Sequence, residues 1–232
     1  MLNDLLHAMG RRLPILVRLR RFALAAWDAW RPPKNTYSQH GEDLLIGDWL
    51  AGVSPDKAIY IDVGANQPTR ISNTYLLYRK GFRGIVVEPN REMLALYRRF
   101  RPRDMILPVG CAREPGVALF RRARSSVESG FSAELPAAGG EYVPILPLDL
   151  IWREAGKSQP VGLLSIDTEG FDYFVLQGAV EVLGHTACLC IEKGESDDAI
   201  TALVEAKGLE LMKDIGCNRI FLNRAVLSQL KG

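Results

Sequence analysis

Two patterns of hydrophobic positions divide the chain. In residues 1–30, leucines and other apolar residues recur at helical spacing, and arginines interrupt them. From residue 36 onward, short apolar runs alternate with stretches of helical periodicity. We therefore predict a helical leader and linker at residues 1–35, followed by a single domain at residues 36–232. Pro14 is expected to break or kink the leader helix.

The apolar runs of the domain predict seven strands with helices between them. The strands are expected at residues 58–63, 84–88, 105–109, 161–166, 187–192, 209–214 and 219–223. The helices are expected at residues 42–50, 73–80, 91–100, 148–155, 173–183 and 197–207, with Ser38 as the first N-cap. Repeated β–α units indicate a parallel sheet with helices on both faces. A short link between the last two strands adds an antiparallel strand, so we predict a Rossmann-like, doubly wound α/β fold with a mostly parallel seven-stranded sheet.

Residues 117–147 interrupt this alternation with a small β-rich excursion, which we interpret as an inserted hairpin or lid. It contains the basic run Arg121-Arg122-Ala123-Arg124. This run is either a solvated loop or a contact for an anionic acceptor, such as a phosphorylated or nucleotide-linked sugar.

Charge separates the leader from the domain. The whole chain has 29 Lys and Arg against 27 Asp and Glu, a net charge of +2 that gives no reason to expect a nucleic-acid partner. Residues 1–35 hold seven Lys and Arg against two Asp, so the leader is 7 − 2 = +5. Arginines together with leucines and tryptophans are typical of an interfacial membrane helix or a partner-docking helix. A helix packed on its own domain is the alternative.

The apolar runs are too short for a transmembrane helix, and arginines break every run that a signal peptide would need. Cys111, Cys188, Cys190 and Cys217 form no CxxC pair, and we interpret all four as reduced core thiols. These features predict a cytoplasmic protein, with peripheral membrane contact through residues 1–30 left open.

Candidate chemistry lies at the ends of the predicted strands, where ligands bind in a doubly wound sheet. Asp62-Val63-Gly64-Ala65-Asn66 follows the first strand, and Glu88 ends the next. A carboxylate there can accept hydrogen bonds from the vicinal hydroxyls of a ribose. A dinucleotide site needs G-x-G-x-x-G, and only Gly64 is present. The turn therefore favours S-adenosylmethionine (SAM) over NAD or FAD. One alternative is a nucleotide-dependent oxidoreductase. The other is that no ligand binds here, with Asp62 capping a turn and Glu88 forming a solvated strand end.

Residues 37–223 resemble the FkbM-type family of SAM-dependent (class I) methyltransferases. The resemblance rests on six blocks, which are Tyr37-Ser38-Gln39-His40-Gly41-Glu42-Asp43-Leu44, Ile61-Asp62-Val63-Gly64-Ala65-Asn66, Ser72-Asn73-Thr74, Val87-Glu88-Pro89, Ser165-Ile166-Asp167-Thr168-Glu169-Gly170 and Asn218-Arg219-Ile220-Phe221. The common form of the family has a glycine two places after the asparagine of the second block, where this chain has Gln67-Pro68.

The resemblance implies methyl transfer from SAM to a hydroxyl, often on a glycan or a natural product. By analogy, the SAM contacts are Gln39, Asp62, Gly64, Asn66, Asn73 and Glu88. Cys111, in the neutral segment after the third strand, is the candidate neighbour of the adenine. A methyltransferase-like binding module without catalysis is an alternative. Loop composition does not identify the acceptor.

The fourth and fifth strands end in carboxylates that are candidates for catalysis. An aliphatic hydroxyl needs a base, or a metal that lowers its pKa, before it attacks a sulfonium. Asp167 and Glu169 are the candidate bases, and His40 is a third. Alternatively, Asp167 binds the amino group of SAM and Glu169 serves the first turn of the next helix. Together with Glu42 and Asp43, these residues make an oxygen-rich divalent-metal site conceivable, although we assign no metal ligand.

Overall fold

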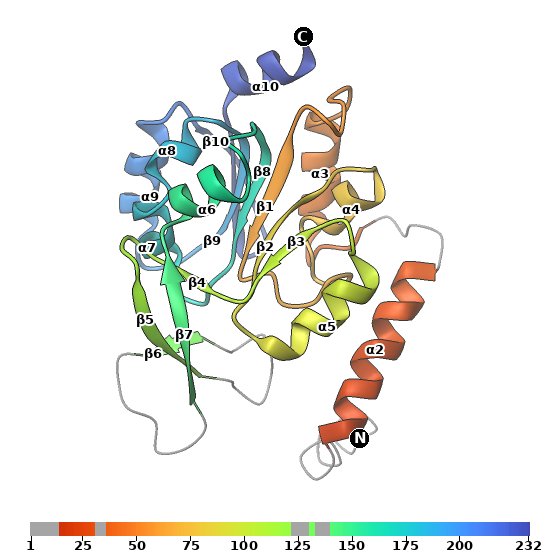
Figure 1. The fold of residues 1–232 in the computed structure, drawn as a ribbon. Helices are drawn as coiled ribbons and strands as arrows, with labels where there is room; N and C mark the ends of the chain where they lie inside the picture. The colour runs from red at the N-terminus through yellow and green to blue at the C-terminus, as the bar shows by residue number, and fades with distance from the viewer. Residues whose placement is uncertain (1–13, 31–35, 122–129, 133–139) are drawn as a thin grey trace.

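The computed structural model describes residues 14–30, 36–121, 130–132 and 140–232 (Figure 1). Within these residues, seven strands form the central sheet in the order β10-β11-β9-β8-β1-β2-β3. They are β1 (Ile59–Val63), β2 (Gly84–Val87), β3 (Met105–Leu107), β8 (Val161–Ile166), β9 (Thr186–Glu192), β10 (Glu210–Ile215) and β11 (Asn218–Leu222). All neighbours pair in parallel except β11, which is antiparallel to β9 and β10. The predicted fold class is confirmed.

Helices cover both faces of this sheet because side chains alternate along its buried strands. Ile59, Ile61 and Val63 of β1 pack into a core cluster with α6 (Leu148–Glu154), α7 (Asp172–Gln177), α8 (Val180–Leu183) and α9 (Asp197–Glu205). Tyr60 points to the opposite face, where α3 (Glu42–Trp49), α4 (Tyr75–Arg79) and α10 (Arg224–Lys231) form a second cluster. A third cluster joins Val86 of β2 to α5 (Arg91–Phe100).

Local contacts explain where the helices differ from prediction. The helix expected at residues 173–183 is two helices that meet at Gly178, where the Asp149 amide donates to the Gly178 carbonyl at 2.8 Å and the Asp149 carboxylate accepts from the Glu181 and Val182 amides at the start of α8. The N-cap of α3 is Gly41 (φ 91°), not Ser38, whose hydroxyl accepts a hydrogen bond from the Gly41 amide at 3.1 Å. Helix α10 was not predicted.

The excursion is β-rich as predicted, but it forms a separate sheet that also takes in residues before it. This sheet contains β4 (Gly110–Cys111), β5 (Gly116–Arg121), β6 (Gly130–Ser132) and β7 (Gly140–Leu146) in the order β4-β7-β5-β6. The strand predicted at residues 105–109 ends at Leu107, and residues 110–111 pair with β7 instead. Figure 1 shows this second sheet beside one end of the central sheet. Residues 122–124 of the basic run lie outside the described residues.

The described part of the leader is α2 (Pro14–Trp30), which packs along α5 (Figure 1). The rings of Phe22 and Phe100 lie 5.3 Å apart, and Arg18 and Arg21 form ion pairs with Glu92 at 3.2 and 3.1 Å. Pro14 is the first residue of the helix as described, a position that proline favours. Residues 1–13 and the predicted linker at 31–35 lie outside the described residues. In the described part of the chain, no helix has the length and apolar character needed to cross a bilayer.

Candidate active site

A cavity of about 320 Å³ opens at the carboxyl ends of β1, β2, β8 and β9. Nine of the ten predicted site residues line it, namely Gln39, Asp62, Gly64, Asn66, Asn73, Glu88, Cys111, Asp167 and Glu169. His40 is not among the lining residues. The fold therefore brings residues from five separate sequence blocks to one edge of the sheet, as the strand-end rule for doubly wound sheets leads us to expect.

Gly64 lies where the turns after β1 and β8 meet. Its φ is +77°, and a Cβ at this position would stand 1.8 Å from the carbonyl oxygen of Asp167. The Gly64 amide donates to the Val87 carbonyl at 2.9 Å, and the Asp167 amide donates to the Val63 carbonyl at 3.0 Å. Only glycine allows this close crossing of backbones. The floor of the cavity is therefore built by the ends of three neighbouring strands.

Glu88 is a buried, oriented carboxylate and not a solvated strand end. Its two oxygens accept hydrogen bonds from the amides of Asn66 and Asn90, each at 2.7 Å. Burial raises the pKa of Glu88 to about 7, although the two amides oppose the shift, and the charge of Asp62 adds to it. Each carboxylate oxygen keeps a further lone pair, so Glu88 can still accept hydrogen bonds from a ligand in the cavity.

Asp62 and Asn73 are held in the wall by neighbouring side chains. The Thr74 hydroxyl donates a hydrogen bond to Asp62. Burial raises the pKa of Asp62, while the charge of Arg101 opposes the shift. The side-chain amide of Asn73 donates through Nδ2 to Ser165 Oγ at 3.2 Å and to Cys190 Sγ at 3.5 Å. These contacts hold the residue 72–74 block against the ends of β8 and β9.

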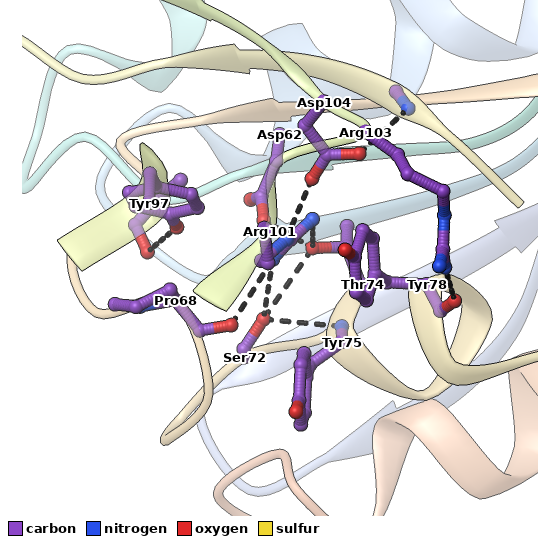
Figure 2. A network of polar contacts seen from close by, with 12 residues as sticks. Asp62, Pro68, Ser72, Thr74, Tyr75, Tyr78, Tyr97, Arg101, Arg103 and Asp104 are labelled. Carbon is purple, nitrogen blue, oxygen red and sulfur yellow. Dashed lines mark hydrogen bonds and ion pairs between the residues drawn. The ribbon is translucent and has the colours of Figure 1, made fainter. Parts of the chain in front are cut away.

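A buried arginine, Arg101, holds the segment of residues 68–74 in place (Figure 2). Arg101 is 0% exposed, and its Nε lies 2.6 Å from Asp104 Oδ2. Its other nitrogens donate to the Pro68 carbonyl at 3.3 Å, to Ser72 Oγ at 3.4 Å and to Thr74 Oγ1 at 3.0 Å. Arg101 therefore acts on Asp62 through Thr74.

Aromatic rings surround the guanidinium of Arg101. The ring centroids of Tyr60, Tyr78 and Tyr97 lie 5.2, 5.5 and 5.2 Å from its central carbon, at cation–π distance. Sequence reasoning missed this cluster. Its only signal was a basic last turn of helix 91–100, which is common at the C-terminus of any helix.

Asp167, Glu169 and Glu192 form an acidic lip, a name we keep for these three residues. Burial raises the pKa of Asp167 to about 8, and the negative charges of Glu192, Glu169 and Asp172 add to this effect. Asp172 fixes the turn beneath the lip, because its Oδ1 accepts from the Thr168 amide at 3.0 Å and from the Thr168 hydroxyl at 3.1 Å.

The cavity as a whole is acidic. Five carboxylate side chains line it, those of Asp62, Glu88 and the acidic lip, while none of the lining residues in the described part of the chain is Lys, Arg or His. The raised pKa values of Glu88 and Asp167 come mainly from burial, and the charges of neighbouring carboxylates add to them. Such a cavity favours a positively charged ligand.

The block at residues 40–43 connects distant parts of the chain. His40 is exposed and lies against Gly216, where a Cβ would stand 2.0 Å from its ring. Buried Glu42 accepts from the His40 amide at 2.8 Å and from Asn218 at 2.6 Å. Burial raises the pKa of Glu42, but its hydrogen bonds outweigh this effect and the net pKa is lowered.

Asp43 in turn accepts from the Thr36 hydroxyl, the Tyr37 amide and the Ser38 hydroxyl at 2.5, 2.8 and 2.8 Å. Glu42 and Asp43 therefore join this block to its own turn and to β11. Across the described residues, no group of three or more His, Cys, Asp or Glu side chains is arranged to hold a metal ion.

The cysteines separate into two groups. Cys111, Cys188 and Cys190 are buried free thiols, as predicted, whereas Cys217 is only partly buried and lines the cavity. The prediction of a core thiol is wrong for Cys217, because the short link between β10 and β11 places it at the strand ends. Cys111 of β4 and Phe120 of β5 also line the cavity, so the second sheet supplies one wall.

Comparisons with known proteins fit this arrangement. The sequence profile of the methyltransferase FkbM domain matches residues 62–211. No curated protein matches the chain. Among solved structures, a TehB-like SAM-dependent methyltransferase from Corynebacterium glutamicum is 13% identical over 80% of this chain and 88% of its own, with a TM-score of 0.40. A protein from Pyrococcus horikoshii described as an RNA methyltransferase is 13% identical over 88% and 98%, with a TM-score of 0.39.

TM-scores this low do not carry an assignment, whereas the profile match spans most of the chain and the carboxyl ends of all four strands that form the cavity. It includes the turn at Gly64, Glu88 and the acidic lip. The chain belongs to the FkbM methyltransferase domain family.

Proposed function

We propose that this protein is a SAM-dependent O-methyltransferase that methylates a hydroxyl of a glycan or natural-product acceptor. The observation that carries the proposal is the acidic cavity, which lies at the strand ends of a methyltransferase domain and is lined by five carboxylates. Its volume of about 320 Å³ falls in the range of small-molecule sites.

The residues of the cavity fit SAM. The oriented carboxylate of Glu88 suits the vicinal hydroxyls of a ribose. The acidic lip and Asp62 suit the positively charged sulfonium and ammonium groups. A dinucleotide would instead bring a pyrophosphate, whose negative charge is repelled by these carboxylates. The charge of the cavity therefore argues against the oxidoreductase alternative.

SAM supplies an activated methyl group, and the chain must supply a base for the acceptor hydroxyl. Asp167 is the side chain best suited to accept this proton, since it lines the cavity and its raised pKa of about 8 makes it a stronger base than an ordinary carboxylate. Glu169 and Glu192 raise that basicity through their charges. His40, outside the lining residues, is not assigned a part in this step.

The test is methyl transfer from SAM carrying a labelled methyl group to a panel of glycans and hydroxylated natural products. We expect a labelled methyl ether on one acceptor class, and a decrease in kcat of about 10²–10⁴-fold for Asp167→Asn. Glu195→Gln is the matched control, because Glu195 is an exposed carboxylate that is absent from the cavity lining.

Two results would contradict the proposal. Failure of the intact chain to bind SAM would remove the cofactor assignment. Binding of SAM without methylation of any acceptor in the panel would favour a binding module that has no catalytic activity.

A further inference from the structure

Helix α2 packs on the domain with its less apolar face. Ala25 and Asp28 are each 1% exposed, and Arg21 turns inward to Glu92. The large apolar side chains point outward instead. They are Ile15, Leu16, Leu19, Trp27 and Trp30, with exposed fractions of 65%, 41%, 59%, 66% and 94%. We call these five residues the α2 stripe.

The members of the α2 stripe share one face of the helix, and by helical position Ala23 and Ala26 lie between Leu19 and Trp27 on that face. Their spacing places them along one side of a helix with 3.6 residues per turn. Phe22, at the edge of the stripe, is 45% exposed even though its ring contacts Phe100. Beside it, a groove of about 600 Å³ between α2 and α5 extends the apolar surface toward Met93 and Leu96. A continuous exposed apolar surface of this kind marks an interaction site.

Basic side chains flank the α2 stripe. Arg18 and Arg20 are both exposed and lie on opposite edges of it by helical position, and Arg18 also forms the ion pair with Glu92 at 3.2 Å. The helix contains one acidic residue, Asp28, and it is buried on the other face. On α5, the exposed Arg99 lies 5.9 Å from the ring of Phe100, which in turn contacts Phe22. The outward surface of α2 is therefore apolar along its centre and positive at its margins.

We propose that α2 docks the protein on a membrane surface that carries anionic headgroups. The α2 stripe enters the interfacial zone, and the flanking arginines reach the lipid phosphates. Tryptophan at the end of the helix suits this zone because its ring is apolar and its N–H is polar. In this arrangement α2 lies parallel to the bilayer surface, because the α2 stripe runs along the length of the helix.

The arginine margins distinguish this partner from a second copy of the chain. A twofold interface through α2 would bring the α2 stripes of two copies together along with their positive margins. An anionic membrane covers the apolar centre and neutralises the margins at the same time.

The experiment is sedimentation of the full chain with vesicles of phosphatidylcholine containing 30% phosphatidylserine, compared with phosphatidylcholine alone. We expect binding to the anionic vesicles, at least tenfold weaker binding to the neutral ones, and a further decrease at high salt. The triple variant Ile15→Gln, Leu19→Gln and Trp30→Gln should lose at least tenfold in affinity. The matched control is Val117→Gln, Val180→Gln and Leu211→Gln, which removes apolar residues of 69%, 42% and 40% exposure elsewhere and should bind as the natural chain does.

Quenching of tryptophan fluorescence provides a second measurement. It reports insertion of the rings into the bilayer, which a purely electrostatic contact would not produce. Brominated lipids should quench Trp27 and Trp30, and Trp30→Gln should reduce this quenching, while Trp152 is 2% exposed and out of reach. Equal binding by the triple variant, or no binding to anionic vesicles, would overturn the proposal. So would a solution dimer that the triple variant abolishes. These assays contain no SAM, so their outcome is independent of the proposed activity.

Discussion

The cluster around Arg101 and the acidic lip both gather charged side chains near the ends of the parallel strands, but in different ways. Around Arg101, one buried cation faces Asp104 directly and Asp62 through Thr74, and three tyrosine rings surround it. In the acidic lip, burial raises the pKa of Asp167, and the charges of the neighbouring carboxylates raise it further. The first arrangement is balanced within the protein. The second becomes favourable when a cation binds.

The comparison distinguishes charged groups that stabilise the fold, as around Arg101, from charged groups that are suited to binding a ligand, as in the acidic lip. A buried ion pair with saturated hydrogen bonds holds backbone segments in one geometry. A group of carboxylates that repel one another costs stability in the free protein, and ligand binding recovers that cost. Replacements in the Arg101 cluster should therefore change mainly the stability of the fold, whereas replacements in the acidic lip should change mainly cofactor binding and transfer.

The largest effect is expected for Arg101→Leu. It leaves the carboxylate of Asp104 buried without its cation, so the free energy of unfolding should fall by about 3–5 kcal/mol. Urea denaturation measures this change. Adding Asp104→Asn should recover part of the loss. Arg103→Leu is the control, since Arg103 contacts Tyr78 but lies outside the cluster, and it should cost about 1 kcal/mol. Equal losses for the two arginines would contradict the account.

Gly64→Ala should have the next largest effect. Alanine at φ +77° is strained, and its Cβ would collide with the Asp167 carbonyl. We expect a loss of about 2–4 kcal/mol in stability, together with loss of SAM binding. Gly52→Ala is the matched control, because Gly52 has a φ of +88° but open space around it, and it should cost about 1 kcal/mol. Equal losses of stability for both variants would contradict the close approach of the turns after β1 and β8 at Gly64.

The pH dependence of stability should reveal the cost of ionising the buried carboxylates Glu88 and Asp167. The folded-state pKa of Glu88 is about 7 and that of Asp167 about 8, both above the usual values of 4.5 and 3.8. The folded protein therefore holds more protons than the unfolded chain between these limits, and its stability decreases as the pH rises from about 4.5 toward 8. For Glu88, the rise in pKa from 4.5 to about 7 corresponds to a decrease of about 3 kcal/mol, at about 1.4 kcal/mol per pKa unit.

Urea denaturation at several pH values measures this slope. Glu88→Gln should flatten it below pH 7, and Asp167→Asn should flatten its upper part. SAM affinity should show the opposite trend, because ionised carboxylates bind a cation more strongly. A ligand-free stability that rises over this range would contradict the assigned pKa directions.

The smallest effect is expected for His40→Ala. His40 is exposed, and it does not line the cavity. We expect stability to change by less than about 0.5 kcal/mol and kcat by less than about threefold. The comparison with Asp167→Asn in the same transfer assay decides between Asp167 and His40 as the base. A loss of more than 100-fold in kcat for His40→Ala would assign the base to His40.

Much of the fold follows from periodicity. Strand β8 and helix α5 have the predicted bounds, because a continuous apolar run and a strongly amphipathic helix each have one stable arrangement. The split at Gly178 was out of reach, because the hydrogen bonds at the junction come from Asp149, which is distant in sequence. Assignment of residues 110–111 to the second sheet failed for the same reason, since its partner β7 lies more than 30 residues away.

The location of the cavity was predictable because all parallel strands present their carboxyl ends to one edge of the sheet. The hydrogen bonds that hold the cavity-lining residues in place were not predictable. Arg101 and Asp172 act through bonds to Thr74 and Thr168, and neither lies in a distinctive sequence motif. The short link that brings Cys217 to the cavity is likewise a product of strand pairing and not of local sequence.

The measurement that tests the central claim most directly is calorimetric titration of the full chain with SAM, alongside Glu88→Ala. One binding site is predicted, and Glu88→Ala should weaken it by about 1–3 kcal/mol through loss of the contacts to the ribose hydroxyls. Glu195→Gln, which alters a carboxylate outside the cavity lining, should leave the affinity unchanged. Absence of SAM binding by the intact chain, or equal affinity for SAM in Glu88→Ala, would contradict the account.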